Sequence, residues 1–372
     1  MHTLRVKGLY RYGIVVMLTA ITLFLGAFSL LYLHPPLQSD STSYIQAMGI
    51  LAGNPLPADF VPTRILATTG GLSLVLLLGH FFGILNAWIL MNFIFFIVIA
   101  LASFFLLRTI FESERVAFLG ALFIVGNYGP IVFGLNYLMD AGGWAFYLLA
   151  LWGVARYVQT RSASAILWAS AAVGIGGLLK EYALLGCIAI AVALIWSFFR
   201  EPRRASYLAL ATAVIAILPV ALVHTVVYMK FGYTYLDWVQ YNKQTYVYAS
   251  RIVEYVKAIG WLINILAPFA IAGAWIWGRS IVKSGRAFLE TPRNIAVIAV
   301  VLSAMPVFAW AGITERVLFV LVPAAALFAC FLFERYERIW YVFLAPLALY
   351  LVASVSMDTL IKFHRVFLHL PL

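Results

Sequence analysis

Long apolar segments separated by short polar ones make up most of the sequence. A helix needs about 20 apolar residues to cross the hydrocarbon core of a bilayer. Eleven segments reach or approach that length, at residues 13–33, 85–107, 116–138, 141–158, 164–179, 182–199, 207–229, 258–278, 294–313, 317–333 and 339–356. With 65% hydrophobic and 10% charged residues, the chain is not a soluble globular domain. We expect an all-α polytopic membrane protein with about 11 transmembrane helices.

A twelfth apolar segment, residues 65–82, is interrupted by hydroxyl residues and glycines between 68 and 73. Cytoplasmic loops carry an excess of Lys and Arg, and one additional span inverts every later loop. If residues 65–82 do not cross the bilayer and the N-terminus is cytoplasmic, most of the 25 Lys and Arg residues face the cytoplasm. We therefore expect a helical first external loop at 34–85 that lies at the outer membrane interface.

This topology brings ionisable side chains from distant parts of the chain to one leaflet. Ionisable groups at membrane depth are costly and usually face a cavity or a charged partner. The predicted set is Asp40 and Arg64 in the first external loop, with Asp140, Lys180, Glu181, Glu315 and Arg316 at the outer ends of spans. We expect these side chains to line one polar cavity that opens to the outside.

The two aspartates are candidates for acid–base chemistry. Asp40 begins a short predicted helix that carries Tyr44 on its apolar face and ends at Gly53. An aspartate there either caps the helix or takes a proton from an acceptor hydroxyl, and the sequence leaves both functions open. Asp140 lies between two apolar spans with almost no loop, which favours a cavity position over a loop position.

The basic residues are candidates for binding phosphate. Lys180 offers a point charge and Arg316 a bidentate donor, although both are also typical of charges that extend from helix ends toward water. The many Tyr and Trp residues of a second external loop, 230–257, are more typical of an interfacial belt than of a sugar-binding platform. No cofactor motif is evident, and no spacing of His, Cys or acidic residues supports a divalent metal.

Five motifs, in this order along the chain, resemble the GT-C superfamily of membrane glycosyltransferases, which includes the protein O-mannosyltransferases and the aminoarabinose transferases of lipid A. The resemblance covers the first seven predicted spans and the region around Glu315. The motifs are Ser39–Tyr44 with Leu51–Gly53, Pro62–Leu66, Tyr137–Asp140, Leu178–Glu181 and Glu315–Pro323.

The resemblance implies an inverting glycosyltransferase that moves a sugar from a polyprenyl-phosphate donor to an acceptor at the external face. It implies that Asp40 is the general base and Asp140 the second acidic residue. It also implies that the donor phosphate is bound by Arg64, Lys180 and Arg316, in a cavity lined by Tyr44, Glu181 and Glu315. Expected partners are the lipid-linked donor, a lipid or glycan acceptor and membrane lipids, with no nucleic acid.

Several features refine this hypothesis. Many family members have a second carboxylate directly after the loop aspartate, where this chain has Ser41, so we expect no metal. The short second external loop and the absence of a large domain after the last span favour a lipid or glycan acceptor over a folded protein. No Asn-x-Ser/Thr sequon occurs, which favours a bacterial plasma membrane.

Two alternatives remain open at this stage. One is a transporter or flippase of an anionic lipid or lipid-linked sugar, and the other is a non-catalytic subunit with the same fold. We expect a single transmembrane domain over residues 1–372, in which 1–257 form the GT-C-like module and 258–372 add C-terminal spans.

The topology predicts the side from which engineered cysteines react. Cysteines introduced at Ser113 and Ser284 should be labelled by an impermeant thiol reagent only from the cytoplasmic side, because both positions lie in predicted cytoplasmic loops. Labelling of both from the external side would contradict the topology and the common cavity.

Overall fold

The computed structural model describes residues 2–33, 37, 39–56, 63–245, 250–310 and 312–367, and all regular structure in these ranges is helical. This confirms the predicted all-α class. The α-helices are α1 (His2–Leu33), α2 (Ser39–Leu51), α3 (Thr63–Phe82), α4 (Ile84–Phe111), α5 (Glu114–Val125), α6 (Asp140–Thr160), α7 (Ala163–Gly177), α8 (Gly186–Phe198), α9 (Pro202–Phe231), α10 (Tyr235–Thr245), α11 (Arg251–Ile263), α12 (Leu266–Ser284), α13 (Pro292–Ala304), α14 (Glu315–Leu318), α15 (Val322–Arg335) and α16 (Leu344–Phe367). Shorter turns are η1 (Gly129–Gly134), η2 (Glu181–Leu185), η3 (Gly285–Glu290), η4 (Met305–Ala309), η5 (Phe319–Leu321) and η6 (Glu337–Phe343).

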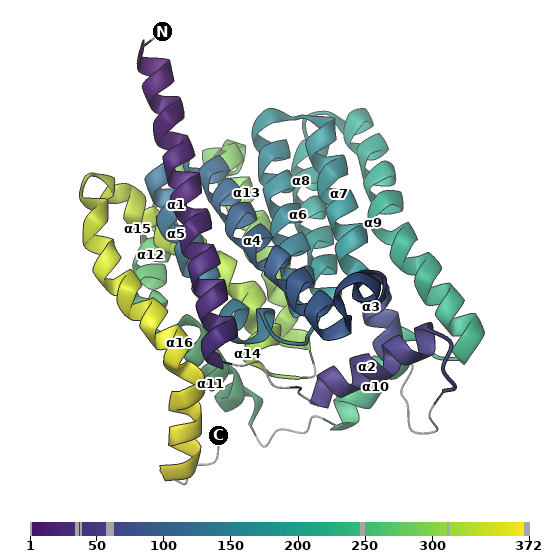
Figure 1. Cartoon of the computed structure of the whole chain (residues 1–372). Helices are drawn as coiled ribbons and strands as arrows, with labels where there is room; N and C mark the ends of the chain where they lie inside the picture. The colour runs from purple at the N-terminus through teal and green to yellow at the C-terminus, as the bar shows by residue number, and fades with distance from the viewer. Residues whose placement is uncertain are drawn as a thin grey trace.

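The helices form a bundle with two chemically different ends. Helices α4, α6, α7, α8 and α9 run side by side through it, and α6 packs against α4 and α7 (Figure 1). At one end lie α2, α3, α10 and α14, and we call it the α2 end. The opposite end carries the start of α9 and the C-terminal ends of α4 and α6, and we call it the basic end because of Arg108, Arg156, Arg161, Arg200 and Arg204.

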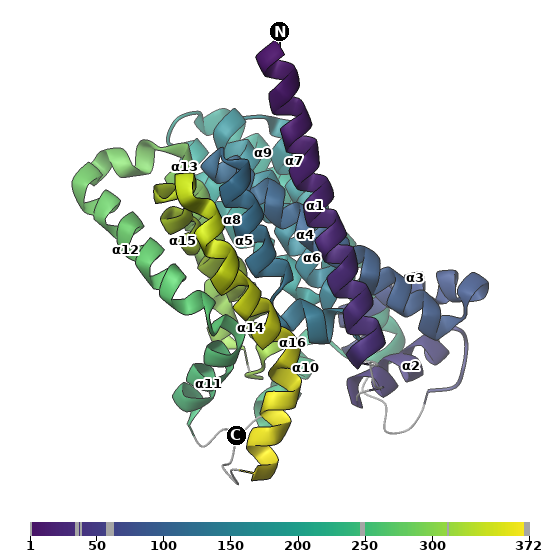
Figure 2. The same cartoon turned by 60° about the vertical axis from the view of Figure 1, so that its left-hand side comes forward.

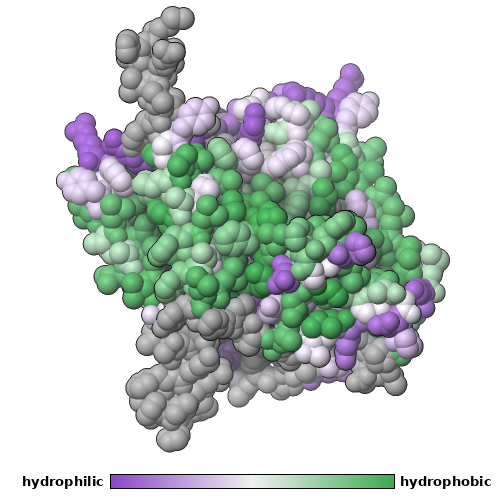
Figure 3. Space-filling model, in the orientation of Figure 1, coloured by the Kyte–Doolittle hydropathy of each residue, from purple (hydrophilic) through white to green (hydrophobic). Residues whose placement is uncertain are grey.

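The surface of the bundle has the polarity expected of a membrane protein. In Figure 3 a broad hydrophobic band lies below a hydrophilic rim at the basic end, and hydrophilic side chains appear again toward the α2 end. Exposed side chains on α9 include Leu210, Ile217 and Met229. Apolar side chains such as these are favourable in contact with lipid chains. The chain is an integral membrane protein.

The number of spans differs from the prediction. Within the described residues, eight helices are long and apolar enough to cross a bilayer, or nine if one bent pair is counted as a span, so the predicted eleven is not confirmed. The bent pair is α11 and α12, which meet at 96°. The predicted span at 258–278 therefore contains a sharp bend, because the backbone leaves the helix at Asn264, where φ is 32° and ψ is −113°.

Residues 65–82 lie in α3, and α2 and α3 make most of the described part of the 34–85 segment helical, as predicted. Length and hydropathy alone would let α3 span a membrane. The axis of α3 is not aligned with the helices of the bundle. In Figure 2, α3 extends across the α2 end at a large angle to α1. The backbone N–H groups of Gly70 and Gly71 donate to the carbonyl of Leu178, at 2.8 and 3.3 Å, and fix α3 against the turn after α7.

Glycine at helix contacts allows the closest approaches in the bundle. A Cβ at Gly174 of α7 would lie 2.6 Å from the carbonyl oxygen of Ile215 in α9. A Cβ at Gly273 of α12 would overlap the carbonyl oxygen of Phe328 in α15. Association of helices in lipid depends on such backbone approach, since lipid chains remove the hydrophobic driving force.

The two glycines of α12 at 273 and 278 provide a matched test of this packing. We expect Gly273→Ala to destabilise the protein by about 1–3 kcal/mol, because α12 and α15 must separate to admit the methyl group. Gly278→Ala should be neutral or slightly stabilising, since no atom lies within 4 Å of the added Cβ and alanine favours a helix. Thermal unfolding of both variants in detergent measures the difference, and equal melting temperatures would contradict it.

Candidate active site

Arg316 contacts both predicted catalytic aspartates. Its Nη2 donates to Oδ2 of Asp40, in the first turn of α2, and its Nη1 lies 3.8 Å from Oδ2 of Asp140, the first residue of α6. The side chain of Asp140 is fully buried, while those of Asp40 and Arg316 are 16% and 21% exposed. Side chains from α2, α6 and α14, elements far apart in the sequence, thus meet at one guanidinium group.

Lys180 forms a second group of contacts beside the first. Its Nζ donates to the hydroxyl of Tyr44 over 3.1 Å and lies 3.6 Å from Oε1 of Glu181. Burial alone would lower the pKa of Lys180, but Glu181, Tyr44 and Asp140 outweigh it, and the pKa is raised. Lys180 is therefore a stable cation. Tyr44 lies four residues after Asp40 on α2, so it joins the two groups.

Close backbone packing positions Lys180. The turn that carries it lies between α3, which donates to Leu178, and the start of α6. A Cβ at Gly143 would lie 2.6 Å from Cβ of Lys180, and one at Gly142 would lie 3.1 Å from Cδ1 of Leu179. The small residues that follow Asp140 therefore allow the lysine to approach the N-terminus of α6.

Buried donors from α4 and α2 hold the segment before Asp140. The indole Nε1 of Trp88 donates to the carbonyl of Leu138 at 3.0 Å, and Nδ2 of Asn92 donates to the same carbonyl at 2.8 Å. Ser41 Oγ donates to the carbonyl of Tyr137 at 2.8 Å. Ser41 thus joins α2 to this segment, which gives the residue after Asp40 a structural function.

Buried polar atoms without a hydrogen-bond partner concentrate at the α2 end. Within the described residues nine such side-chain atoms occur, and five belong to this region: both carboxylate oxygens of Asp140, Nε1 of Trp144, Oε2 of Glu181 and Oγ1 of Thr314. A buried polar group is nearly always satisfied in a native protein, and an exception often has a function. These atoms provide acceptors and donors for the hydroxyl and phosphate groups of a ligand.

Three further residues at this site were not predicted as site residues. Trp144 lies one helical turn after Asp140 and stacks on Tyr182, with ring centroids 6.2 Å apart. Burial raises the pKa of Tyr235 on α10, and the carboxylate of Glu181 raises it further, so α10 also faces the site. Trp144 could have been identified from the sequence, because residues i and i+4 of a helix lie on the same face and Trp144 is four residues after Asp140. Tyr182 directly follows Glu181, but nothing in the sequence separates Tyr235 from the other aromatic residues of its loop.

The predicted site residues thus divide into three groups. Six of them meet at the α2 end, namely Asp40, Tyr44, Asp140, Lys180, Glu181 and Arg316. Glu315 is half-buried and begins α14 beside Arg316, and its part in lining a cavity stays a prediction. Arg64 lies in α3, but its side chain is outside the described residues.

The described residues contain no group of three or more His, Cys, Asp or Glu side chains suited to a metal ion. The absence of a metal from the reaction stays a prediction.

Comparison with known proteins shows which family and which fold the chain resembles. Residues 71–224 match the family model of the dolichyl-phosphate-mannose-protein mannosyltransferases. The structure is similar to an archaeal oligosaccharyltransferase, AglB from Archaeoglobus fulgidus, solved with an inhibitory peptide and a dolichol-phosphate, with a TM-score of 0.58 and 12% identity. The GT-C resemblance is confirmed.

The similarity of fold extends over nearly the whole chain. The match to AglB covers 94% of this chain and 56% of that one, and a match to the apo oligosaccharyltransferase of the same organism covers 96% and 55%, with a TM-score of 0.53 and 12% identity. The chain therefore spans little more than half the length of these proteins. No sequence among the curated proteins matches it. The matching family supports the predicted enzyme class, a glycosyltransferase.

The ion pairs of Arg316 predict a coupled effect on stability. Arg316→Gln should lower the free energy of unfolding by about 3 kcal/mol, because the buried carboxylate of Asp140 would lose the cation that pairs with it in the described structure. Adding Asp140→Asn should recover part of that loss. Denaturant titration of both single variants and the double variant measures the coupling.

A second Arg–carboxylate pair serves as the control. Arg293 pairs with Glu334, but both side chains are more exposed, at 29% and 34%. Arg293→Gln should therefore lower the free energy of unfolding by less, about 1 kcal/mol. Strictly additive effects of Arg316→Gln and Asp140→Asn would contradict the proposed coupling.

Proposed function

We propose that the chain is an inverting glycosyltransferase that moves a sugar from a polyprenyl-phosphate donor to a lipid or glycan acceptor at the external face of the membrane. The observation that carries the proposal is the position of Arg316 between Asp40 and Asp140. The GT-C resemblance implies that these aspartates are the general base and the second acidic residue. The family model and the dolichol-phosphate named with AglB support a lipid-phosphate donor.

In the proposed reaction Asp40 accepts the proton of the acceptor hydroxyl. The hydroxyl oxygen then attacks the anomeric carbon of the donor sugar, and the bond from that carbon to the phosphate oxygen breaks. One displacement inverts the anomeric centre and releases polyprenyl phosphate. The ion pair with Arg316 favours the charged carboxylate of Asp40, which is the form that can accept a proton.

Fixed positive charge is required where the leaving phosphate develops negative charge. Arg316 can form bidentate contacts with a phosphate, and Lys180 adds a second, buried cation. Arg316 pairs with Asp40 in this structure. When the donor binds, the guanidinium of Arg316 would therefore contact both the donor phosphate and the carboxylates. Arg64 is proposed as a third phosphate contact on the family resemblance.

A transporter of an anionic lipid would fit this distribution of charge less well. Transporters typically have charged or helix-breaking residues at mid-membrane on paired helices. Here Asp40, Lys180 and Arg316 gather at the α2 end, and the described buried charged residues are Asp140 and Lys180 at that same end. Among the described residues, α11 and α12 are the one sharply bent helix pair that is together long and apolar enough to span, and Pro219 within α9 is a second helix-breaking residue. The position of the charged residues favours an enzyme that works at one membrane face.

The base assignment predicts a loss of activity without a loss of binding. Asp40→Asn should lower sugar transfer by a factor of roughly 10²–10⁴, the range typical of losing a general base, because an amide cannot accept the proton. Binding of polyprenyl phosphate should persist, since Lys180 and Arg316 are unchanged. Transfer of labelled sugar in membranes with equal amounts of each variant measures the first effect, and binding to purified protein measures the second.

Asp237 provides a matched control for this substitution. It also lies in the first turn of a helix at the α2 end, where it accepts from the backbone N–H and hydroxyl of Thr234, but it is exposed. Asp237→Asn should leave transfer near the level of the unmodified protein. Near-normal transfer by Asp40→Asn would make Asp40 a helix cap and move the base to Asp140.

A further inference from the structure

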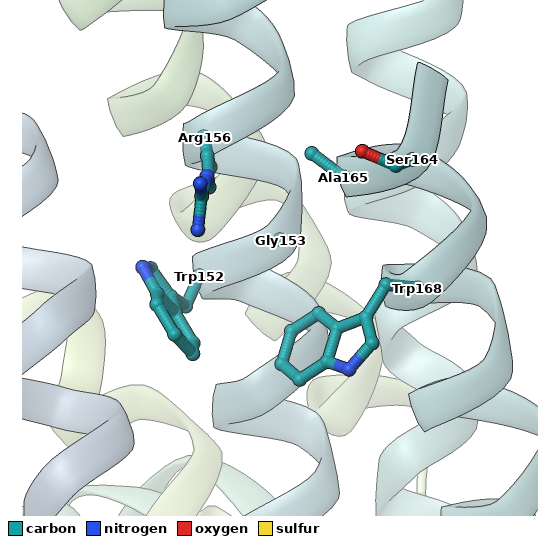
Figure 4. A pocket seen from close by; sticks show the side chains of 6 residues that line it. All are labelled: Trp152, Gly153, Arg156, Ser164, Ala165 and Trp168. Atoms are coloured by element: carbon teal, nitrogen blue, oxygen red, sulfur yellow. The ribbon is translucent and has the colours of Figure 1, made fainter. Parts of the chain in front are cut away.

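A pocket at the basic end has no part in the proposed reaction. It lies between α6 and α7, has a volume of about 370 Å³ and is lined by Trp152, Gly153, Arg156, Ser164, Ala165 and Trp168. Figure 4 shows Arg156 directly above Trp152, with Trp168 on the other side of the opening. Both α6 and α7 also reach the α2 end, so the pocket and the candidate active site are at opposite ends of the same helices.

Arg156 supplies a positive charge that the protein leaves uncompensated. Its side chain is exposed and forms no ion pair or hydrogen bond with the described residues, whereas its neighbour Arg108 pairs with Glu114 at 3.3 Å. Arg161 is also engaged, because its guanidinium stacks on Trp196 at 3.8 Å and donates to Ser197. No acidic residue lines this pocket, although Arg156 and Trp152 also line an adjoining pocket that contains Glu112. The guanidinium of Arg156 is therefore available to an anion.

The remaining lining residues add donors for a phosphate group. Ser164 lines the pocket from the first turn of α7, where its hydroxyl forms a hydrogen bond of 2.7 Å with the hydroxyl of Ser162. Unpaired N–H groups and the helix dipole favour an anion there. Arg156 of α6 and the N-terminus of α7 thus line the same pocket.

The aromatic walls of the pocket favour a ligand with an apolar part. The rings of Trp152 and Trp168 meet edge to face with centroids 5.3 Å apart, and Trp168 is 42% exposed. A Cβ at Gly153 would lie 2.9 Å from the ring of Trp168, so glycine is what lets this ring rest on α6. Ile175, two turns farther along α7 on the same face, is 53% exposed. Trp168 and Ile175 form an apolar track along α7 that leads away from Arg156.

The depth of the pocket matches a lipid headgroup. Arg156 lies five residues before Arg161, where α6 ends, which is about 7 Å along the helix axis. The polar interface of a bilayer is of similar thickness, and tryptophan is enriched there. A soluble phosphate would use the arginine but not the apolar track.

We propose that this pocket binds an anionic phospholipid of the leaflet at the basic end. The phosphate would contact Arg156, Ser164 and the N-terminus of α7, and an acyl chain would follow Trp168 and Ile175. This inference is independent of the proposed glycosyltransferase activity, because its test measures binding and requires no transfer.

Native mass spectrometry of the detergent-purified protein tests the proposal with phosphatidylglycerol and phosphatidylcholine of identical acyl chains. The unmodified protein should retain phosphatidylglycerol preferentially. Arg156→Gln should weaken that binding roughly fivefold, the effect of one basic residue at a membrane surface, and Trp168→Leu should weaken binding of both lipids. Both side chains are exposed, so the variants should fold normally.

Arg203→Gln is the matched control, because Arg203 is an exposed arginine at the same end that does not line the pocket. It should leave the binding of phosphatidylglycerol unchanged. Equal losses in Arg156→Gln and Arg203→Gln, or no loss in Arg156→Gln, would overturn the proposal. Displacement of phosphatidylglycerol by millimolar inorganic phosphate would identify a free-anion site and overturn the lipid assignment.

Discussion

A carboxylate that is fully buried needs a cation, and the α2 end of this protein is organised around that requirement. Asp140 begins α6 in the interior of the bundle, where a lone charge would cost several kcal/mol. Arg316 reaches it from α14 and at the same time pairs with Asp40 on α2. One guanidinium therefore joins α2, α6 and α14.

The packing around this cluster depends on small residues and backbone donors. Glycines at the start of α6 and in α3 let the Leu178–Lys180 turn approach both helices. Donors from α4 and α2 hold the segment that leads into Asp140. The result is a rigid support with several buried polar atoms left unpaired. Preorganised groups of this kind contribute to catalysis because they need no reorganisation when charge develops.

Much of this arrangement could be predicted from the sequence, and the reasons are physical. The distribution of Lys and Arg determined the topology, and the topology predicted that Asp40, Asp140, Lys180 and Arg316 share one end. The pairing of Arg316 with the two aspartates could not be predicted, because it depends on side-chain geometry between elements far apart in the sequence. The break at Asn264 was missed since apolar residues flank it on both sides and one backbone conformation decides it. Tyr235 was not predicted as a site residue, because nothing in the sequence distinguishes it from the other aromatic residues of its loop.

The central claim is that Lys180 and Arg316 bind the phosphate of a polyprenyl-phosphate donor beside Asp40. A structure of the protein with bound polyprenyl phosphate tests it most directly. The account predicts that the phosphate lies within hydrogen-bond distance of both cations, with the lipid leaving the site toward the membrane at the α2 end. A phosphate bound elsewhere, with Arg316 still paired to Asp40 and Asp140, would contradict it.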